Sequence, residues 1–272
     1  MADFLSYQFI VNALLASLFG AVTAGIMGTY VVTRRMVFIT GGVTHASFGG
    51  LGLGYFLGIN PIVGAAGIAV IAGLSVEYFN QKRKIREDSL IAMAWSLGMA
   101  LGIIFIFITP GYAPNLMSYL FGSILTVSTG DLIAMNMLMI IVSLFFILFF
   151  RAIQYITFDE EFARTAGIPV NLFKYLLMVL VALTAVIYIR VAGIILVLSM
   201  LTIPQNTAML LAKKLKNIIF WSVFFSFAGS IAGLLLSYYR DIPSGASIIF
   251  SLMVIYFLIA VFKPILRKRI KS

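Results

Sequence analysis

The chain consists mainly of long apolar stretches separated by short polar gaps. Each stretch holds about 20 mostly apolar residues, which is the length that a helix needs to cross a bilayer. The pattern predicts about nine membrane-spanning helices, with eight to ten compatible, at 8–32, 37–58, 61–79, 89–109, 131–150, 170–189, 191–211, 217–237 and 244–262. A shorter, hydroxyl-rich stretch at 115–127 predicts a re-entrant or half-length helix on the outer side of the membrane. We therefore expect an all-α, polytopic transmembrane bundle that forms a single domain over residues 1–272.

Composition supports a protein that is embedded in a lipid bilayer. Of the residues, 62% are hydrophobic and only 10% are charged, whereas a soluble domain has about 25% charged residues. The absence of cysteine excludes disulfides and thiolate metal sites. The first residues carry no basic run, so we do not expect a cleaved secretory signal.

The positive charge predicts an orientation in the membrane. A net charge of +10 lies in short gaps between apolar stretches, which is typical of cytoplasmic loops and not of a nucleic-acid-binding face. With the N-terminus outside and the C-terminus in the cytoplasm, only Arg190 and Arg240 of the 19 lysines and arginines fall outside. The chain is thus expected to be a multi-pass membrane protein that binds no nucleic acid.

The second predicted span carries a stripe of small residues. They recur every four positions and would stack on one face of a helix, at Gly42, Ala46, Gly50, Gly54 and Gly58. Tandem small residues of this kind let another helix approach closely in lipid. The stripe therefore predicts a tight helix–helix contact.

His45, the only histidine, lies beside that stripe in the same span. An ionisable ring in lipid is costly, so it marks by default a pathway, a relay or a ligand position. Thr44 and Ser47 are hydroxyl neighbours that could line a wet cavity with it. A closed zinc site needs about four ligands, and every acid of the chain lies near a span end or in a loop, so any metal contact at His45 is expected to be transient. The alternative is a packing histidine that bonds a neighbouring carbonyl.

One polar loop predicts a short surface helix near 158–168 on the cytoplasmic side. Asp159 suits an N-cap, two glutamates suit the first turn, and Gly167 suits the position after the last turn. Such a helix, with apolar side chains at Phe158 and Phe162, is a candidate docking element for a protein partner. The residues expected to carry that contact are Asp159, Glu160, Glu161, Phe162, Ala163, Arg164 and Gly167.

Catalytic chemistry is missing from the sequence. It contains no Gly-x-x-x-x-Gly-Lys-Ser/Thr phosphate loop, and one histidine without cysteine provides no triad or zinc-protease motif. The chain is therefore not expected to be an enzyme. If it drives transport, the energy must come from another subunit or from an ion gradient.

Several ordered blocks resemble the permease subunits of bacterial ABC importers for zinc and manganese. The blocks are Arg34-Arg35-Met36-Val37-Phe38, Thr44-His45-Ala46-Ser47, Arg86-Glu87-Asp88-Ser89, Asp159 to Pro169, Leu201-Thr202-Ile203-Pro204 and Asp241-Ile242-Pro243-Ser244-Gly245. The resemblance implies a type II importer-like fold in a bacterial plasma membrane. It also implies a homodimer, two ATP-binding subunits that bind ATP-Mg and dock the helix near Phe162, and an extracytoplasmic solute-binding protein. This chain itself would bind no cofactor.

The sequence departs from the family pattern at two places. Gly41 stands where the family typically has an aspartate, and Gln205 and Asn206 replace two alanines after Pro204. Neutral amide oxygens could substitute for the lost carboxylate, and a helix break near Pro204 could free backbone carbonyls toward the path. The expected pathway residues are His45, Thr44, Ser47, Thr202, Pro204, Gln205 and Asn206.

Two rival functions remain open on sequence alone. The chain could be a passive channel or gradient-driven carrier for a small polar or chelated-metal substrate, or a scaffold that does not transport. The resemblance leaves the choice between zinc and manganese open.

Overall fold

The structure is a computed structural model that describes residues 7–82, 86–110, 122 and 124–269. Every regular element in these ranges is helical. The α-helices are α1 (Gln8–Thr33), α2 (Val37–Phe56), α3 (Pro61–Gln81), α4 (Glu87–Ile108), α6 (Thr129–Leu148), α7 (Phe150–Phe158), α8 (Glu160–Thr165), α9 (Val170–Met200), α10 (Ile203–Leu211), α11 (Leu215–Arg240) and α12 (Ser244–Arg269). A short 3-10 helix, η2, covers Ile124–Thr126.

The predicted all-α transmembrane bundle is confirmed. Eight helical segments among the described residues are long and apolar enough to cross a membrane. The predicted span at 37–58 corresponds to α2, which has 20 residues and is not among these eight because its glycines, hydroxyls and His45 lower its hydropathy. Most of the predicted half-length helix at 115–127 lies outside the described residues, and its described end is η2.

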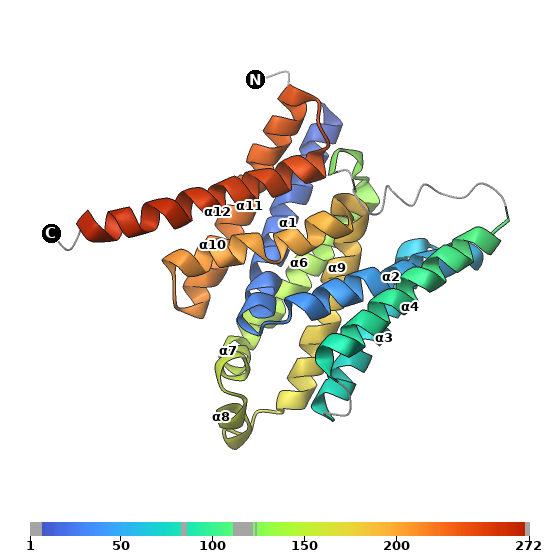
Figure 1. Cartoon of the computed structure of the whole chain (residues 1–272), viewed down its shortest axis with the longest axis horizontal. Coiled ribbons are helices and arrows are strands. Elements are labelled where there is room, and N and C mark those ends of the chain that lie inside the picture. Colours follow the sequence, from blue (N-terminus) through green and yellow to red (C-terminus); the bar gives the residue numbers. More distant parts are fainter. Residues whose placement is uncertain (1–6, 83–85, 111–121, 123, 270–272) are drawn as a thin grey trace.

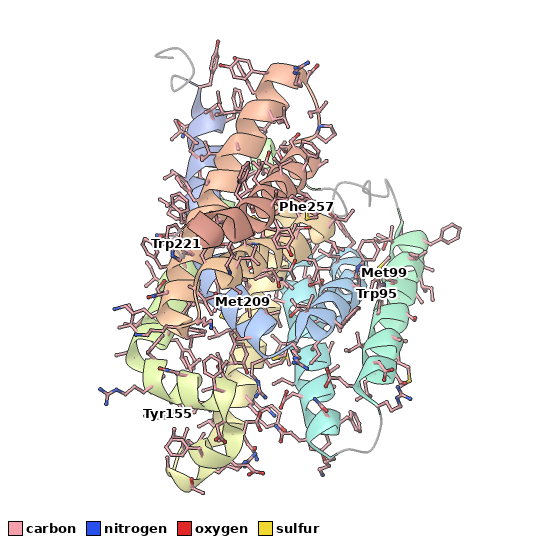
Figure 2. All side chains as sticks on the ribbon, turned by 60° about the vertical axis from the view of Figure 1, so that its left-hand side comes forward. Trp95, Met99, Tyr155, Met209, Trp221 and Phe257 are labelled. Atoms are coloured by element: carbon pink, nitrogen blue, oxygen red, sulfur yellow. The ribbon has the colours of Figure 1, made fainter. Side chains whose placement is uncertain are left out.

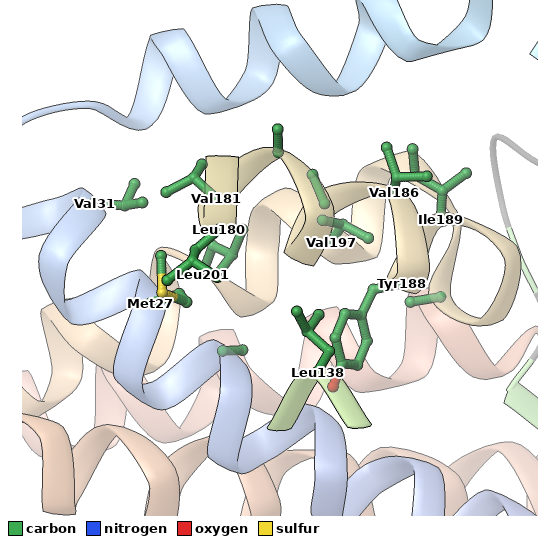
Figure 3. Close-up of a cluster of buried hydrophobic side chains, with 14 of the residues drawn as sticks. Met27, Val31, Leu138, Leu180, Val181, Val186, Tyr188, Ile189, Val197 and Leu201 are labelled. Atoms are coloured by element: carbon green, nitrogen blue, oxygen red, sulfur yellow. The ribbon is translucent and has the colours of Figure 1, made fainter. Parts of the chain in front are cut away.

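The buried core lies where α1, α6 and α9 meet near the centre of the bundle (Figure 1). Met27 of α1, Leu138 of α6 and Val181 of α9 belong to one continuous apolar cluster, which Figure 3 shows from inside. Helices at the periphery leave large apolar side chains outside, such as Phe107 of α4. In a bilayer these side chains contact lipid, so their exposure alone does not indicate a protein partner.

Helix α2 packs against both α3 and α4, and at several of its glycines the backbones approach each other directly. A β-carbon added at Gly98 of α4 would lie 2.3 Å from the Cα atom of Ala46, and one added at Gly50 would lie 2.2 Å from the carbonyl oxygen of Gly64. Only glycine allows backbones to come this close. The contact therefore fixes the position of the helix that carries His45.

The five small residues of the predicted stripe do not all contact the same neighbour. Gly42 and Ala46 contact α4, whereas Gly50 and Gly54 contact α3. Gly58 lies beyond the end of α2 with φ of +67° and open space around it, so it forms the following turn. The reason is geometric: four residues turn an α-helix by about 400°, so such a stripe drifts by about 40° at each step.

Substitution of Gly98 by alanine tests the α2–α4 contact. Because the atoms it would meet are backbone atoms of Ala46, we expect Gly98→Ala to destabilise the protein by about 1–3 kcal/mol. The matched control is Gly67→Ala in α3, where no atom lies within 4 Å, and where alanine should be neutral or slightly stabilising. Thermal unfolding of the detergent-purified variants measures the difference, and equal melting temperatures would contradict the assigned contact.

Candidate translocation site and docking helix

The imidazole of His45 is held against the indole of Trp95, which belongs to α4. The two ring centroids lie 3.8 Å apart with an angle of 9° between the planes, so the rings are stacked. Figure 2 places Trp95 and Met99 on α4. The Nδ1 atom of His45 is buried and has no hydrogen-bond partner within the described chain. Stacking thus fixes the ring plane and leaves one ring nitrogen unpaired.

The hydroxyls expected to help His45 are used inside α2. Thr44 and Ser47 are both buried, and their hydroxyls donate to the carbonyl oxygens of Thr40 and Thr44, each at 2.6 Å. Both hydroxyls therefore use their hydrogens within α2 and keep only their oxygen lone pairs for contact with a cation. Gly41, the position of the family aspartate, packs against the side chain of Leu198.

A closed metal site is not formed by the part of the chain that the structure describes. No group of three or more His, Cys, Asp or Glu residues lies close enough there to hold an ion. A single chain therefore offers His45 as an isolated nitrogen, without the additional ligands of a structural site.

Two interruptions shape the path from α9 to α10. Gly193 has φ of 73° and ψ of 161°, which breaks the helical geometry inside α9. The second interruption, at Leu201 and Thr202, lies just before the predicted position at Pro204 to Asn206. The break precedes Pro204 because a proline suits the first turn of a helix, so Pro204 belongs to the start of α10 and not to the break itself.

Two side-chain amides bond backbone carbonyls around this second interruption, among them that of Met200, to which Pro204 offers no N–H. The Nε2 atom of Gln205 donates to the carbonyl oxygens of Ala24 and Met200, at 2.7 and 3.1 Å. The Nδ2 atom of Asn206 donates to the carbonyl oxygen of Thr202 at 2.7 Å. The two amides therefore use their NH₂ groups to stabilise the break. Gln205 is buried and its Oε1 is unpaired, whereas Asn206 is exposed.

The predicted surface helix is present as α8, and local signals position it. The Oδ1 atom of Asp159 accepts from the backbone N–H of Phe162 at 2.9 Å, which caps the first turn. Gly167, with φ of 77°, ends the segment, and the N–H of Ile168 donates to the carbonyl oxygen of Ala163. Helix α8 thus begins and ends where the sequence pattern places it.

The faces of α8 differ from the expectation at one residue. Ala163 is fully buried against Ile156 of α7 and against Val170 and Phe173 of α9, so it cannot contact a partner in this conformation. A small apolar residue on the inner face lets α8 lie close to these helices. The side chains that point outward are Phe158, Glu161, Phe162, Arg164 and Thr165.

An ion cluster that the sequence did not reveal joins α8 to the rest of the bundle. The carboxylate of Glu160 pairs with Arg34, at the end of α1, and with Lys174 of α9 at 3.4 Å. Lys174 also pairs with Glu77 of α3 at 3.0 Å. We refer to Arg34, Glu160, Lys174 and Glu77 as the α8 ion cluster. Its paired residues Arg34 and Glu160 lie 126 positions apart in the chain, which is why local patterns gave no signal.

The electrostatics of the cluster keep Glu160 ionised. Partial burial alone would raise the pKa of Glu160, but the charges and hydrogen bonds of Arg34 and Lys174 outweigh burial and lower it below its usual value. A lowered folded-state pKa means that the stabilisation is present above the unfolded-state pKa and is lost as pH falls through the folded value. The cluster is therefore intact at neutral pH.

These features define a polytopic membrane transport protein with a surface helix suited to docking. The chain belongs to the ABC 3 transport family, whose profile matches residues 6–263. The resemblance found in the sequence is thereby confirmed at the level of the family.

Relatives and solved structures match nearly the whole chain. It is 34% identical over 260 residues to the manganese transport system membrane protein MntC of Halalkalibacterium halodurans. This match covers 96% of this chain and 89% of that protein. It is 38% identical over 240 residues to a probable metal transport system membrane protein of Chlamydia pneumoniae, covering 86% and 82%. PsaBC from Streptococcus pneumoniae, solved in complex with Fab, superposes with a TM-score of 0.85 and 31% identity, covering 95% of this chain and 94% of that one.

The role of Gln205 at the helix break can be tested by stability. Replacing it with methionine keeps the volume but removes the bond to Ala24 and the side-chain donor of the Met200 carbonyl, to which Pro204 offers no N–H, so we expect Gln205→Met to cost about 1–3 kcal/mol. Asn206→Ala should cost clearly less, because the carbonyl of Thr202 keeps the backbone N–H of residue 206 as a donor. Denaturation of the purified variants measures both, and an equal loss would contradict the assigned role.

Proposed function

We propose that this chain is the permease subunit of an ATP-driven importer for a divalent metal ion of the manganese or zinc class. The observation that carries the proposal is the end-to-end match to a manganese transport membrane protein together with the close superposition on PsaBC. Both cover the bundle and α8, so the match is not limited to the apolar pattern that unrelated membrane proteins share.

The partners follow from the family and from what the sequence lacks. An ABC transport family member without a phosphate loop takes its energy from separate ATPase subunits, which bind ATP-Mg, while this chain binds no cofactor and is not an enzyme. The ATPase contact is assigned to α8, whose Phe162 and Arg164 face outward. A solute-binding protein would deliver the ion from outside.

The orientation in a bacterial plasma membrane is proposed from the position of the basic residues. The end of α1, the start of α2, the end of α3 and α8 lie at one end of the bundle (Figure 1). The basic residues Arg34, Arg35 and Lys82 belong to that end, which is assigned to the cytoplasm. The N-terminus is then outside and the C-terminus inside.

The proposed pathway contact is His45, with a second copy of the chain providing a second imidazole. The unpaired Nδ1 supports this role, because a ring nitrogen without a structural partner is free to contact an ion and release it. Two such rings hold an ion weakly, as passage requires. Gly41 supplies no carboxylate, so the choice between manganese and zinc is left to the uptake assay.

Uptake by the reconstituted complex tests the proposal. Proteoliposomes that contain this chain, its ATPase and its binding protein should accumulate radioactive manganese or zinc when ATP is present. His45→Ala should lower uptake by about tenfold or more, as expected when a metal-site group is lost. Gly67→Ala, in open space on α3, serves as the control with unchanged uptake.

Two results would contradict the proposal. Metal flux that persists without the ATPase would identify a passive channel or a gradient-driven carrier. Equal uptake by the wild-type and His45→Ala complexes would remove His45 from the pathway while leaving the importer assignment in place.

A further inference from the structure

Helix α8 contacts the bundle through two different kinds of interaction. Its apolar side packs on α7 and α9 through Ala163, in a small cluster separate from the main core. Its connection to α1 runs through Glu160, which reaches across to Arg34 and Lys174. A polar cleft of about 400 Å³ lies beside this connection, lined by Asn80, Gln81, Glu160, Arg164, Asn171 and Lys174. The cleft separates α8 from the end of α3, so α8 is free to shift on that side.

Arg34 lies at the corner between α1 and the pathway helix. It directly follows α1, Arg35 adopts φ of 59°, and Met36 precedes α2, so only three residues join the two helices. The backbone N–H of Met36 donates to the carbonyl oxygen of Val31 at 2.8 Å, which closes the corner. A displacement of Arg34 therefore displaces the first turn of α2, because a connection of three hydrogen-bonded residues cannot absorb the movement by changing its own conformation.

Arg34 is also fixed to the segment that carries α8. Its Nη1 atom donates to the carbonyl oxygen of Ile156 in α7 at 3.1 Å, while its Nη2 atom pairs with Glu160. One guanidinium thus contacts both helices of the α7–α8 segment. The planar, forked geometry of arginine suits such a double contact, which a lysine would not reproduce.

The other half of the ion cluster connects the same carboxylate to two neighbours of α2. Lys174 belongs to α9 and Glu77 to α3, and both helices pack against α2. The side chain of Glu77 is 4% exposed and that of Lys174 is 13% exposed, so the pair is buried. Gln81 adds a hydrogen bond to Glu77 at 2.8 Å. Removing one member of such a buried pair leaves the other charge without compensation.

From this geometry we propose that the α8 ion cluster transmits the movement of α8 to the pathway helix α2, with Glu160 and Arg34 as its positioning residues. Neither residue contacts the transported ion. The ATPase moves α8, Glu160 carries that movement to Arg34, and the short corner passes it to the helix of His45. This inference rests on the proposed function, because it needs an ATPase that moves α8.

The first test separates transport from ATP hydrolysis in the full complex. Glu160→Gln keeps the shape of the side chain but removes its charge. We expect ATP hydrolysis to stay near the wild-type rate. Metal uptake per ATP hydrolysed should fall at least about fivefold, because the coupling between two sites in a protein typically changes an equilibrium by a factor of about five or more. The control is Asp88→Asn, which breaks the solvent-exposed pair with Arg86 and should leave the ratio unchanged.

A second set of variants asks whether the two residues act through each other. Arg34→Gln alone should lower the same ratio, and the double variant Arg34→Gln with Glu160→Gln should be no worse than the more affected single variant. Losses that add up would overturn the proposal. The proposal would also be overturned if the Glu160→Gln complex failed to assemble and lost both uptake and hydrolysis, since that pattern indicates a purely structural role.

A distance measurement gives an independent readout, and the natural absence of cysteine makes labelling simple. Spin labels on cysteines introduced at the exposed positions Phe38 of α2 and Thr165 of α8 report the distance between these helices. In the wild-type complex this distance should stay narrow with and without ATP, because the two helices move together. In Glu160→Gln it should broaden or change with ATP, and an unchanged narrow distribution would overturn the proposal.

Failure of the proposed function and failure of the ion-cluster role give different results. A wild-type complex that takes up no metal would remove the proposed function. A wild-type complex that transports, together with a Glu160→Gln complex that keeps the wild-type ratio of uptake to hydrolysis, would remove only the role of the ion cluster.

Discussion

The close approach of the α2 backbone to α3 and α4 is the constraint on which the rest of the structure depends. Inside a bilayer, lipid tails are as apolar as leucine, so helices gain no hydrophobic free energy by associating. Association then requires dense packing, and the facing glycines Gly50 and Gly64 provide it by removing side chains. This packing leaves α2 little freedom to slide, so a push at its end becomes a movement of the whole helix together with His45.

Most of the polar side chains considered for the pathway donate their hydrogens to backbone carbonyls inside the bundle. Thr40, Thr44 and Ser47 use their hydroxyls on the carbonyls of their own helix, and Gln205 uses its amide on the break before α10. Such bonds are required because no water replaces them in lipid. The Nδ1 atom of His45 and the Oε1 atom of Gln205 differ from these donors, since nothing in the described chain hydrogen-bonds them.

The features that the sequence predicts well are those encoded locally. Apolar stretches of spanning length gave the helices, and Asp159 and Gly167 gave the ends of α8, because a cap acts within a few residues. Features that depend on distant partners were not accessible. The partner of Glu160 lies in another helix, the inner position of Ala163 depends on α7 and α9, and the stripe at Gly42 drifts between two neighbours.

A connection built from charges has a property that an apolar contact lacks. Apolar packing gives an atom no single partner, whereas a carboxylate in a buried cluster is held to particular cations, because separating it from them leaves uncompensated charge. Glu160 is held in this way to two cations, Arg34 and Lys174. It therefore stays paired with both as α8 moves, and the segments that carry these cations are displaced with it. Because Arg34 lies at the corner of α2 and Lys174 belongs to α9, which packs against α2, a movement of α8 reaches the pathway helix through both cations.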